Sequence, residues 1–306
     1  MAKQRLSGRG GALLGTLLCI MALGCREAER PAVNAGEVRV VAGIGPTAHF
    51  VERIGGGHVT VDVLIPAGRS PHSFALTPKQ MVGLSRARLF FAVGMPFEKR
   101  LAGRIAEVSA SIEIVDTTAG IERRRMTAPD ENASEHDHAD GARDPHVWLD
   151  PRLAKIIARN ICGALQILDP DNAAEFRQNT LALEADLDRL HARLTAALAP
   201  HAGARILVFH PAYGYFTDAY GLQQMAVEVE GKAPSGKRLA ALIARAKADG
   251  VRVIFVQPSG STSVAGAIAG EIGATVATLD PLAGDYIANM DAMAAAIMAA
   301  LEDPEG

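Results

Sequence analysis

The sequence predicts an α/β protein of two lobes, each a parallel sheet flanked by helices, joined by one long spanning helix. Short apolar runs typical of strands alternate with helical patterns along the chain after residue 37. The strand runs are almost continuously apolar, which is typical of parallel sheets covered by helices on both faces. A chain of 306 residues, 49% hydrophobic and 21% charged, has the composition of a folded protein and the length for two domains.

Eight segments with the apolar, β-branched composition of strands are predicted strands. Four lie in the first half, at residues 38–42, 59–64, 89–93 and 112–115, and four in the second half, at residues 205–209, 225–229, 251–256 and 275–279. The helical patterns between them include residues 46–55, 78–87, 151–168 and 235–249.

A long helix is predicted between the two halves, at residues 170–200. The chain has neither Gly nor Pro between Pro170 and Pro200, and Asp171 or Asn172 is the expected N-cap. About 28 helical residues would span about 42 Å, enough to run along both lobes. The mature chain therefore divides into an N-terminal lobe (37–168), the linking helix (170–200) and a C-terminal lobe (201–306). The helix face predicted to be buried, at steps of three or four, consists of Phe176, Thr180, Leu183, Leu187, Leu190, Leu194 and Leu198.

Residues 1–24 have the pattern of an export signal. Basic residues precede an apolar run at 11–23 that is too short for a membrane span. The run ends in Ala-Leu-Gly-Cys at 22–25, which resembles the lipobox of bacterial lipoproteins, so we expect Cys25 to carry lipid at a membrane surface. An ordinary signal peptide with a chance cysteine is the alternative. Residues 25–36 are predicted to be a polar tether between the lipid and the fold.

The charge of the chain argues against nucleic acid as a partner. The formal net charge is −3, and removing the leader with its three basic residues leaves 28 basic against 34 acidic residues, a balance of −6. Phosphate contacts need clustered Lys and Arg, and this chain is mildly acidic with one Trp and four Tyr.

Residues 127–143 are a polar insert of low hydrophobicity, which predicts a mobile surface loop. His136 and His138, with acidic neighbours at 135 and 137, form a small cluster that could attract a metal ion. A solvated loop with chance histidines is an equally open interpretation.

Four residues that could carry chemistry share one structural position. His72 lies in the loop after the predicted strand 59–64, His146 precedes the helix at 151–168, His210 directly follows the strand 205–209, and Asp285 follows the strand 275–279. Ligands of open α/β sheets bind beyond the carboxyl ends of the strands. Three imidazoles and a carboxylate make a suitable set for Zn²⁺. The spacing alone is weak, because a single His after a strand is more often a hydrogen-bonded structural residue.

Four sequence stretches give a more specific indication. They are VLIPAGRSPHSFALTP at 63–78, DPHVWLDP at 144–151, VFHPAYGYF at 208–216 and LDPLAGDY at 279–286. With them, the chain from about residue 38 to residue 299 resembles the solute-binding lipoproteins of ABC importers for zinc and manganese, the cluster A-I metal-binding family.

The resemblance implies a non-enzymatic protein of the periplasm or cell surface that captures Zn²⁺ in a cleft between the lobes and delivers it to an ABC permease. By resemblance, His72, His146 and His210 are metal ligands, and Asp285 takes the place of the C-terminal carboxylate ligand. Asp280 is a second carboxylate close by and keeps that assignment open. The family also implies a monomer with little hinge closure. The insert at 127–143 looks like a short form of the family's His-rich loop.

Zinc is the expected cargo, with Mn²⁺ or Fe²⁺ as the alternatives. Family members with Glu at the third ligand position look like manganese binders, whereas this chain has His210 there, and nitrogen ligands favour Zn²⁺. Two other classes of function stay as remote alternatives. An exported metallohydrolase would need an open coordination position on the metal, and an adhesin would keep the fold without using the site.

Overall fold

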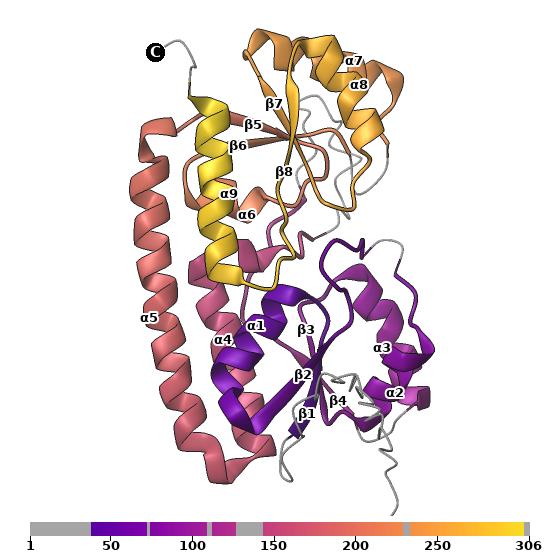
Figure 1. Cartoon of the computed structure of the whole chain (residues 1–306), viewed down its shortest axis with the longest axis vertical. Coiled ribbons are helices and arrows are strands. Elements are labelled where there is room, and N and C mark those ends of the chain that lie inside the picture. The colour runs from indigo at the N-terminus through magenta and orange to yellow at the C-terminus, as the bar shows by residue number, and fades with distance from the viewer. Residues whose placement is uncertain (1–37, 72–73, 109–111, 127–142, 229–232, 303–306) are drawn as a thin grey trace, which may run out of the picture. The chain divides into compact units, whose positions relative to one another are not determined.

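Two parallel β-sheets form the framework of the structure (Figure 1). The computed structural model describes residues 38–302 except 72–73, 109–111, 127–142 and 229–232. Within these residues, each sheet has four strands, in the orders β2-β1-β3-β4 and β6-β5-β7-β8. The strands pair in parallel throughout both sheets. The predicted α/β class with two parallel sheets is therefore confirmed.

The first sheet agrees closely with the predicted strands. Figure 1 shows α1 on one side of this sheet and α2 and α3 on the other, which explains why all four residues of β3 are buried. The helix α3 was not among those predicted. The strands are β1 (Val38–Ala42), β2 (Val59–Val63), β3 (Leu89–Ala92) and β4 (Glu113–Asp116), and the helices are α1 (Gly45–Gly55), α2 (Pro78–Arg86), α3 (Pro96–Val108) and α4 (Pro151–Leu168).

The second sheet differs from the predicted strands most at β6 and β7, and β7 begins two residues later than predicted, at Val253. β6 begins two residues early, at Gln223, because it is an edge strand whose polar Gln223 and Gln224 give no apolar signal. The strands are β5 (Arg205–Val208), β6 (Gln223–Ala226), β7 (Val253–Val256) and β8 (Thr275–Thr278), and the helices are α6 (Gly214–Ala219), α7 (Gly236–Ala248), α8 (Thr262–Ile272) and α9 (Tyr286–Leu301).

The two sheets repeat one strand order. In each, the first strand of the sequence lies between the second and the third, so the connections leave the central pair of strands in opposite directions. Such a reversal opens a crevice at the carboxyl ends of the central strands, where ligands of α/β proteins bind. The segment that follows β5 begins at this position in the second sheet.

The long helix between the two sheets has the buried face that the sequence predicts. α5 (Ala173–Leu198) has 26 residues and is extended by short 3-10 turns at Pro170–Asn172 and Ala199–His201. The Asn172 side chain does not cap it and bonds Asp169 instead, with 2.7 Å between Nδ2 and Oδ2. Its buried residues are the predicted Phe176, Thr180, Leu183, Leu187, Leu190, Leu194 and Leu198.

α5 packs against helices from both parts of the fold. It contacts α1 and α4 beside the first sheet and α9 beside the second. Ion pairs at the edges of these contacts join Arg53 to Asp186, Lys155 to Asp188 and Arg193 to Asp291, at 2.5, 2.7 and 2.7 Å. One hydrophobic cluster extends through these contacts from β1 to α9, and a smaller one lies beneath α7 and α8. Of the described helices, none combines the length and the apolar character needed to cross a membrane.

A buried carboxylate lies at the carboxyl end of β3. Glu98, in the first turn of α3, is 3% exposed, and its Oε2 accepts hydrogen bonds from the backbone N–H groups of Val93 and Met95 at 3.0 and 2.8 Å. Its Oε1 lies so close to Gly43 that a Cβ there would come within 1.9 Å of it, so the turn after β1 needs a glycine. Burial raises the pKa of Glu98 from the ordinary 4.5 to about 7.

We expect Glu98 to make the stability of the protein depend on pH. A carboxyl whose pKa rises on folding stabilises the fold most below its unfolded pKa of 4.5, and this contribution is lost as the pH rises through about 7. The loss amounts to about 3 kcal/mol. Glu98→Gln keeps a side-chain oxygen that accepts hydrogen bonds from the backbone but cannot ionise. The unfolding free energy of this variant should therefore vary less than that of the wild type from pH 4.5 to 8. Urea unfolding of both proteins across this range tests it, and parallel pH curves would contradict it.

We expect the apolar face of α5 to supply a large part of the stability. Leu187 is fully buried, and Leu187→Ala should lower the unfolding free energy by about 2–5 kcal/mol, because it removes buried methyl groups and leaves a cavity. Leu181 is 61% exposed on the same helix, so Leu181→Ala should change the unfolding free energy by less than about 0.5 kcal/mol. Equilibrium denaturation provides the comparison. Equal effects would mean that this face does not hold the core.

Candidate metal site

His146 is held in a fixed orientation by a neighbouring carboxylate. It lies just before a short 3-10 turn (Val147–Leu149) that leads into α4, and it is 3% exposed. Asp144, itself 1% exposed, accepts two hydrogen bonds on Oδ1, from the backbone N–H of His146 at 3.0 Å and from Nδ1 of the ring at 2.8 Å. The ring thus donates through Nδ1, which leaves the lone pair of Nε2 for a metal ion.

His210 has the same arrangement on the second sheet. It is 7% exposed, follows β5 through Phe209, and its Nδ1 lies 2.8 Å from Oε2 of Glu228. Glu228 comes from the end of the neighbouring strand: the backbone N–H groups of Val227 and Glu228 donate to the carbonyls of Val208 and Phe209. A carboxylate again accepts a hydrogen bond from Nδ1, which fixes the orientation of the ring.

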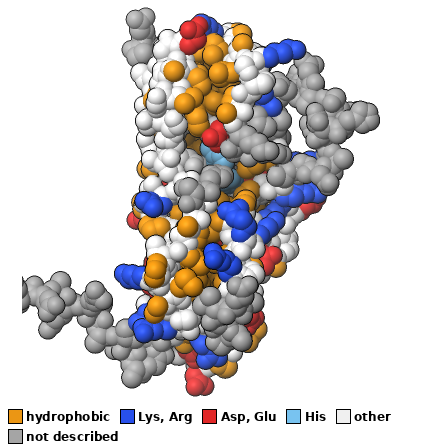
Figure 2. Space-filling model, turned by 90° about the vertical axis from the view of Figure 1, so that its right-hand side faces the viewer, with side chains coloured by type: hydrophobic (Ala, Val, Ile, Leu, Met, Phe, Trp, Pro, Cys, Tyr) orange, Lys and Arg blue, Asp and Glu red, His pale blue; other side chains and the backbone are white. Residues whose placement is uncertain are grey.

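The two oriented imidazoles are neighbours in space although 64 positions separate them in the sequence. Their ring centroids are 5.6 Å apart, with an interplanar angle of 74°. Histidine atoms reach the surface at mid-height of the face drawn in Figure 2. The structure therefore brings together two of the predicted ligands, one preceding α4 and one following β5.

Buried aromatic side chains fix the segments around this pair. Nε1 of Trp148 donates to the carbonyl of Pro281 at 2.8 Å, and the hydroxyl of Tyr286 donates to the carbonyl of Trp148 at 2.7 Å. The Tyr213 hydroxyl donates to the carbonyl of Leu279 at 2.8 Å. Burial raises the pKa of Tyr213 well above its ordinary value, so the phenol stays protonated as a donor. These bonds tie the segments of His146 and His210 to the chain that follows β8.

The remaining predicted site residues have different positions. His72, Cys25, His136 and His138 lie outside the described residues. Asp285 is exposed, and its Oδ1 accepts a hydrogen bond from the N–H of Ala288 at 3.2 Å, which caps the amino end of α9. Among the residues that the structure describes, no three His, Cys, Asp or Glu side chains form a group that could hold a metal ion.

Asp280, the alternative carboxylate, lies nearer the carboxyl end of β8. It directly follows Leu279, whose carbonyl binds the Tyr213 hydroxyl, and its own Oδ1 accepts a hydrogen bond from the N–H of Leu282 at 2.9 Å. Burial raises the pKa of this carboxyl. Its negative charge contributes to the raised pKa of Tyr213, which lies three residues after His210. Asp280 is thus a half-buried carboxylate close to the segment that follows His210.

Two residues with a role in the site did not appear among the predicted ones. Asp144 had a readable signal, because an acidic residue two positions before a His can bind that ring locally. Glu228 had none, because only the pairing of β6 with β5 brings it beside His210, 18 positions away.

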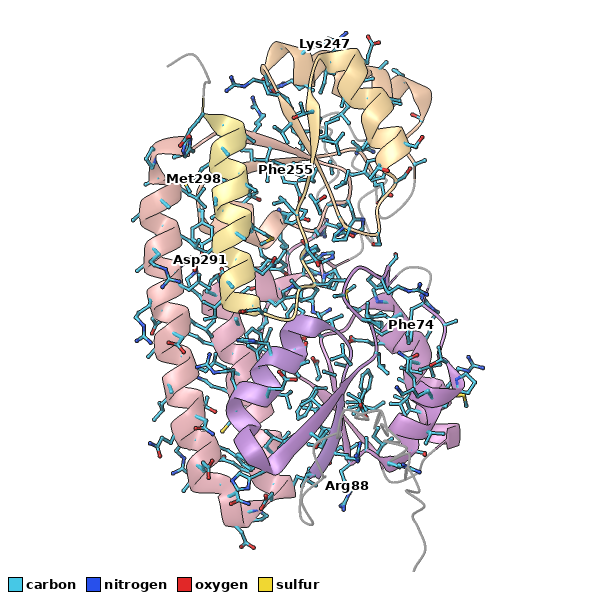
Figure 3. All side chains as sticks on the ribbon, in the orientation of Figure 1. Phe74, Arg88, Lys247, Phe255, Asp291 and Met298 are labelled. Atoms are coloured by element: carbon cyan, nitrogen blue, oxygen red, sulfur yellow. The ribbon has the colours of Figure 1, made fainter. Side chains whose placement is uncertain are left out.

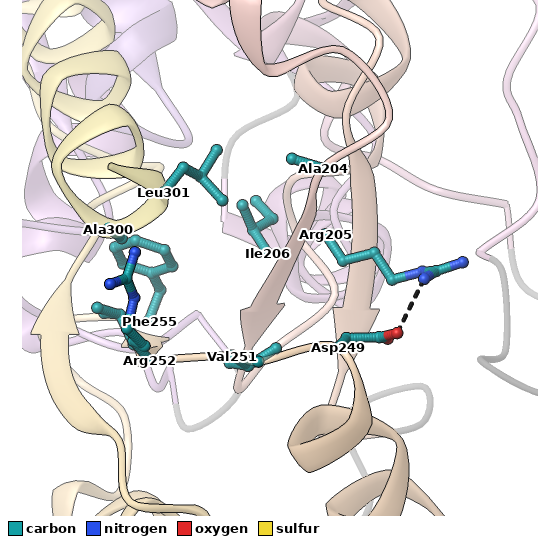
Figure 4. A pocket seen from close by; sticks show the side chains of 11 residues that line it. Ala204, Arg205, Ile206, Asp249, Val251, Arg252, Phe255, Ala300 and Leu301 are labelled. Carbon is teal, nitrogen blue, oxygen red and sulfur yellow. Dashed lines mark hydrogen bonds and ion pairs between the residues drawn. The ribbon is translucent and has the colours of Figure 1, made fainter. Parts of the chain in front are cut away.

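A cavity of about 450 Å³ lies away from this site (Figure 4). It is lined by the amino ends of β5 and β7 and the last turn of α9, and the pair Arg205–Asp249 spans its edge at 3.1 Å. His210 lies at the opposite end of β5. The chemistry of the oriented histidines therefore identifies the site better than cavity size does.

Comparisons with known proteins agree with this geometry. The profile of the family described as "ZnuA: Zinc-uptake complex component A periplasmic" matches residues 40–300. The high-affinity zinc uptake system protein ZnuA of Bacillus subtilis is 32% identical over 283 residues, which cover 87% of this chain and 86% of that protein. The chain also matches the zinc-binding protein AdcA of Streptococcus pyogenes at 29% identity, but spans about half (51%) of its length. A crystal structure of ZnuA has a TM-score of 0.80 and 37% identity, covering 87% of this chain and 100% of that one. The chain therefore belongs to the ZnuA family of periplasmic zinc-uptake components.

Proposed function

We propose that the protein captures Zn²⁺ outside the cytoplasm and delivers it to the permease of an ABC importer. The observation that carries this proposal is the pair of buried histidines, His146 and His210, each with Nδ1 bonded to a carboxylate. Membership of a zinc-uptake family supports the same cargo. The protein acts as a binding component and not as an enzyme.

The ligand set we propose is His72, His146, His210 and one carboxylate. Three imidazole nitrogens and one carboxylate oxygen complete a tetrahedron around Zn²⁺, which leaves no position for an activated water. Such a closed set favours capture of the ion over hydrolysis. It also favours Zn²⁺ over Mn²⁺ or Fe²⁺, since harder ions prefer more oxygen ligands.

We assign the carboxylate to Asp280 and not to Asp285. Asp285 is exposed and already used at the amino end of α9, whereas Asp280 is half-buried beside the Tyr213 segment that follows His210. Both residues match the acidic stretch that suggested a fourth ligand from sequence. The assignment to Asp280 follows from its burial and from its place near the segment that follows His210.

The location we propose is the outer face of a membrane, with Cys25 acylated and residues 25–36 as a tether. The lobes 37–168 and 201–306 would hold the site between them, braced by the helix at 170–200, and the protein would act as a monomer. The insert 127–143, with His136 and His138, would form an accessory loop. The export pattern of residues 1–24 and the periplasmic family support this location.

We expect the carboxylate behind His146 to determine zinc affinity. Asp144→Asn removes the charge that keeps Nε2 a strong donor to the metal, so the affinity for Zn²⁺ should fall about 10–100-fold. Glu228→Gln should act similarly on His210. Competition with a zinc chelator measures the affinity, and circular dichroism checks that both variants fold. Affinities close to that of the wild type in both would reject the assigned role of these carboxylates.

We expect Asp280 and Asp285 to respond differently to the same substitution. Asp280→Asn should weaken Zn²⁺ binding by at least about tenfold, because it removes a charged ligand. Asp285→Asn should leave affinity and stability unchanged, because Asn caps a helix as well as Asp does. Isothermal titration of both variants decides the assignment. A loss confined to Asp285→Asn would reverse it.

A further inference from the structure

The α2–α3 face, defined here as the exposed surface of residues 74–105, has a charge unlike that of the whole chain. Its acidic residue, Glu98, is buried at 3% exposure. Among the described side chains from Phe74 to Ile105, the exposed charges are therefore all basic, although the chain as a whole is acidic. None of its basic residues forms an ion pair within the described part of the chain. These exposed residues are Lys79, Arg86, Arg88, Lys99, Arg100 and Arg104.

An apolar groove of about 330 Å³ crosses this face. Its walls include the rings of Phe74 and Phe97, which meet edge to face at 5.2 Å between centroids, and Phe74 is labelled in Figure 3. Leu76 and Leu101 also line the groove, and Arg100 and Arg104 contribute to its lining. In Figure 2, Lys and Arg side chains border hydrophobic ones over the lower half, which holds the first sheet.

A smaller cavity extends the groove toward the metal-binding part of the chain. It shares Phe97 and Arg100 with the groove and adds Pro71, the residue directly before His72. Phe74 lies two positions after His72. A partner in the groove would thus contact the chain on both sides of a proposed zinc ligand, so that binding the partner and holding the ion could influence each other.

The chemistry of the groove favours a protein segment as its occupant. Guanidinium groups pair with carboxylates through two parallel hydrogen bonds, and a concave aromatic pocket accepts an apolar side chain as an anchor. A membrane surface is flat and would reach the charged rim but not the apolar floor. Carboxylates flanking an apolar side chain match both parts of the groove.

We propose that the groove of the α2–α3 face docks an acidic segment with an apolar anchor on the outer side of the membrane permease. This inference rests on the proposed function, since it names the surface through which zinc delivery occurs. Opposite charges on the two partners also speed their encounter, so the cationic face would raise the docking rate.

The test compares zinc uptake with zinc binding in the same variants of the full-length protein. Arg100→Glu combined with Arg104→Glu should lower uptake of labelled zinc by cells at limiting zinc about tenfold or more. Zinc affinity of the purified variant, measured by calorimetry, should stay within about twofold of the wild type. Arg177→Glu, an exposed reversal on α5, is the control and should leave both unchanged.

A second pair of variants guards against misfolding. Ala75 is exposed in the groove lining. Ala75→Asp should therefore repel the acidic segment and lower zinc uptake, whereas Ala75→Lys should leave zinc uptake at the level of the wild type. Wild-type uptake by the double Arg variant and by Ala75→Asp, at normal abundance, would overturn the proposal. Stronger binding to phosphatidylglycerol than to phosphatidylcholine vesicles, lost in the double variant, would also overturn it and assign the face to lipid. Absence of zinc binding by the wild-type protein would instead refute the proposed function.

Discussion

The hydrogen bond between Asp144 and His146 is the interaction on which the site depends. A buried carboxylate is costly unless it is paired, and Asp144 is compensated by the backbone N–H and the ring of one neighbouring residue. The bond determines the tautomer of the imidazole, because Nδ1 must donate for the carboxylate to be satisfied. Glu228 imposes the same choice on His210. Both rings are therefore held in a fixed orientation by a carboxylate on Nδ1.

This arrangement requires that the segments carrying the histidines keep their positions relative to each other. The bonds from Trp148 to Pro281 and from Tyr286 to Trp148 run between the chain before α4 and the chain between β8 and α9. The ring of Tyr286 also packs on Phe50 of α1 at 4.8 Å, within the cluster that α5 carries from one sheet to the other. Wide separation of the sheets would break buried hydrogen bonds and expose aromatic surface together. A preformed site is consistent with such a frame.

Periodicity carried enough information for the long helix and most of the strands, but the site depends on tertiary contacts. Seven positions of α5 were predicted because a buried helix face repeats every three or four residues, whatever the rest of the fold does. His146 and His210 were candidates from their places at the ends of elements and were predicted as ligands from the family resemblance. Glu228 was missed because the register of β6 brings it to His210, and the two glutamines at the start of β6 lack the apolar pattern by which a strand is predicted. Asp280 and Asp285 follow the same strand, and only their burial separates them.

Glu98 connects the architecture of the first sheet to the charge of its surface. Its carboxyl group accepts hydrogen bonds from the loop after β3, and Gly43 makes room for it after β1. An acidic residue at this point of an exposed α3 would face outward and neutralise part of the adjacent positive charge. Because it is drawn inward instead, Lys99, Arg100 and Arg104 are left without a nearby exposed carboxylate in the described part of the helix. The same buried group therefore holds the turn at the carboxyl end of β3 and leaves the described exposed charges of the α2–α3 face all basic, beside the segment that carries His72.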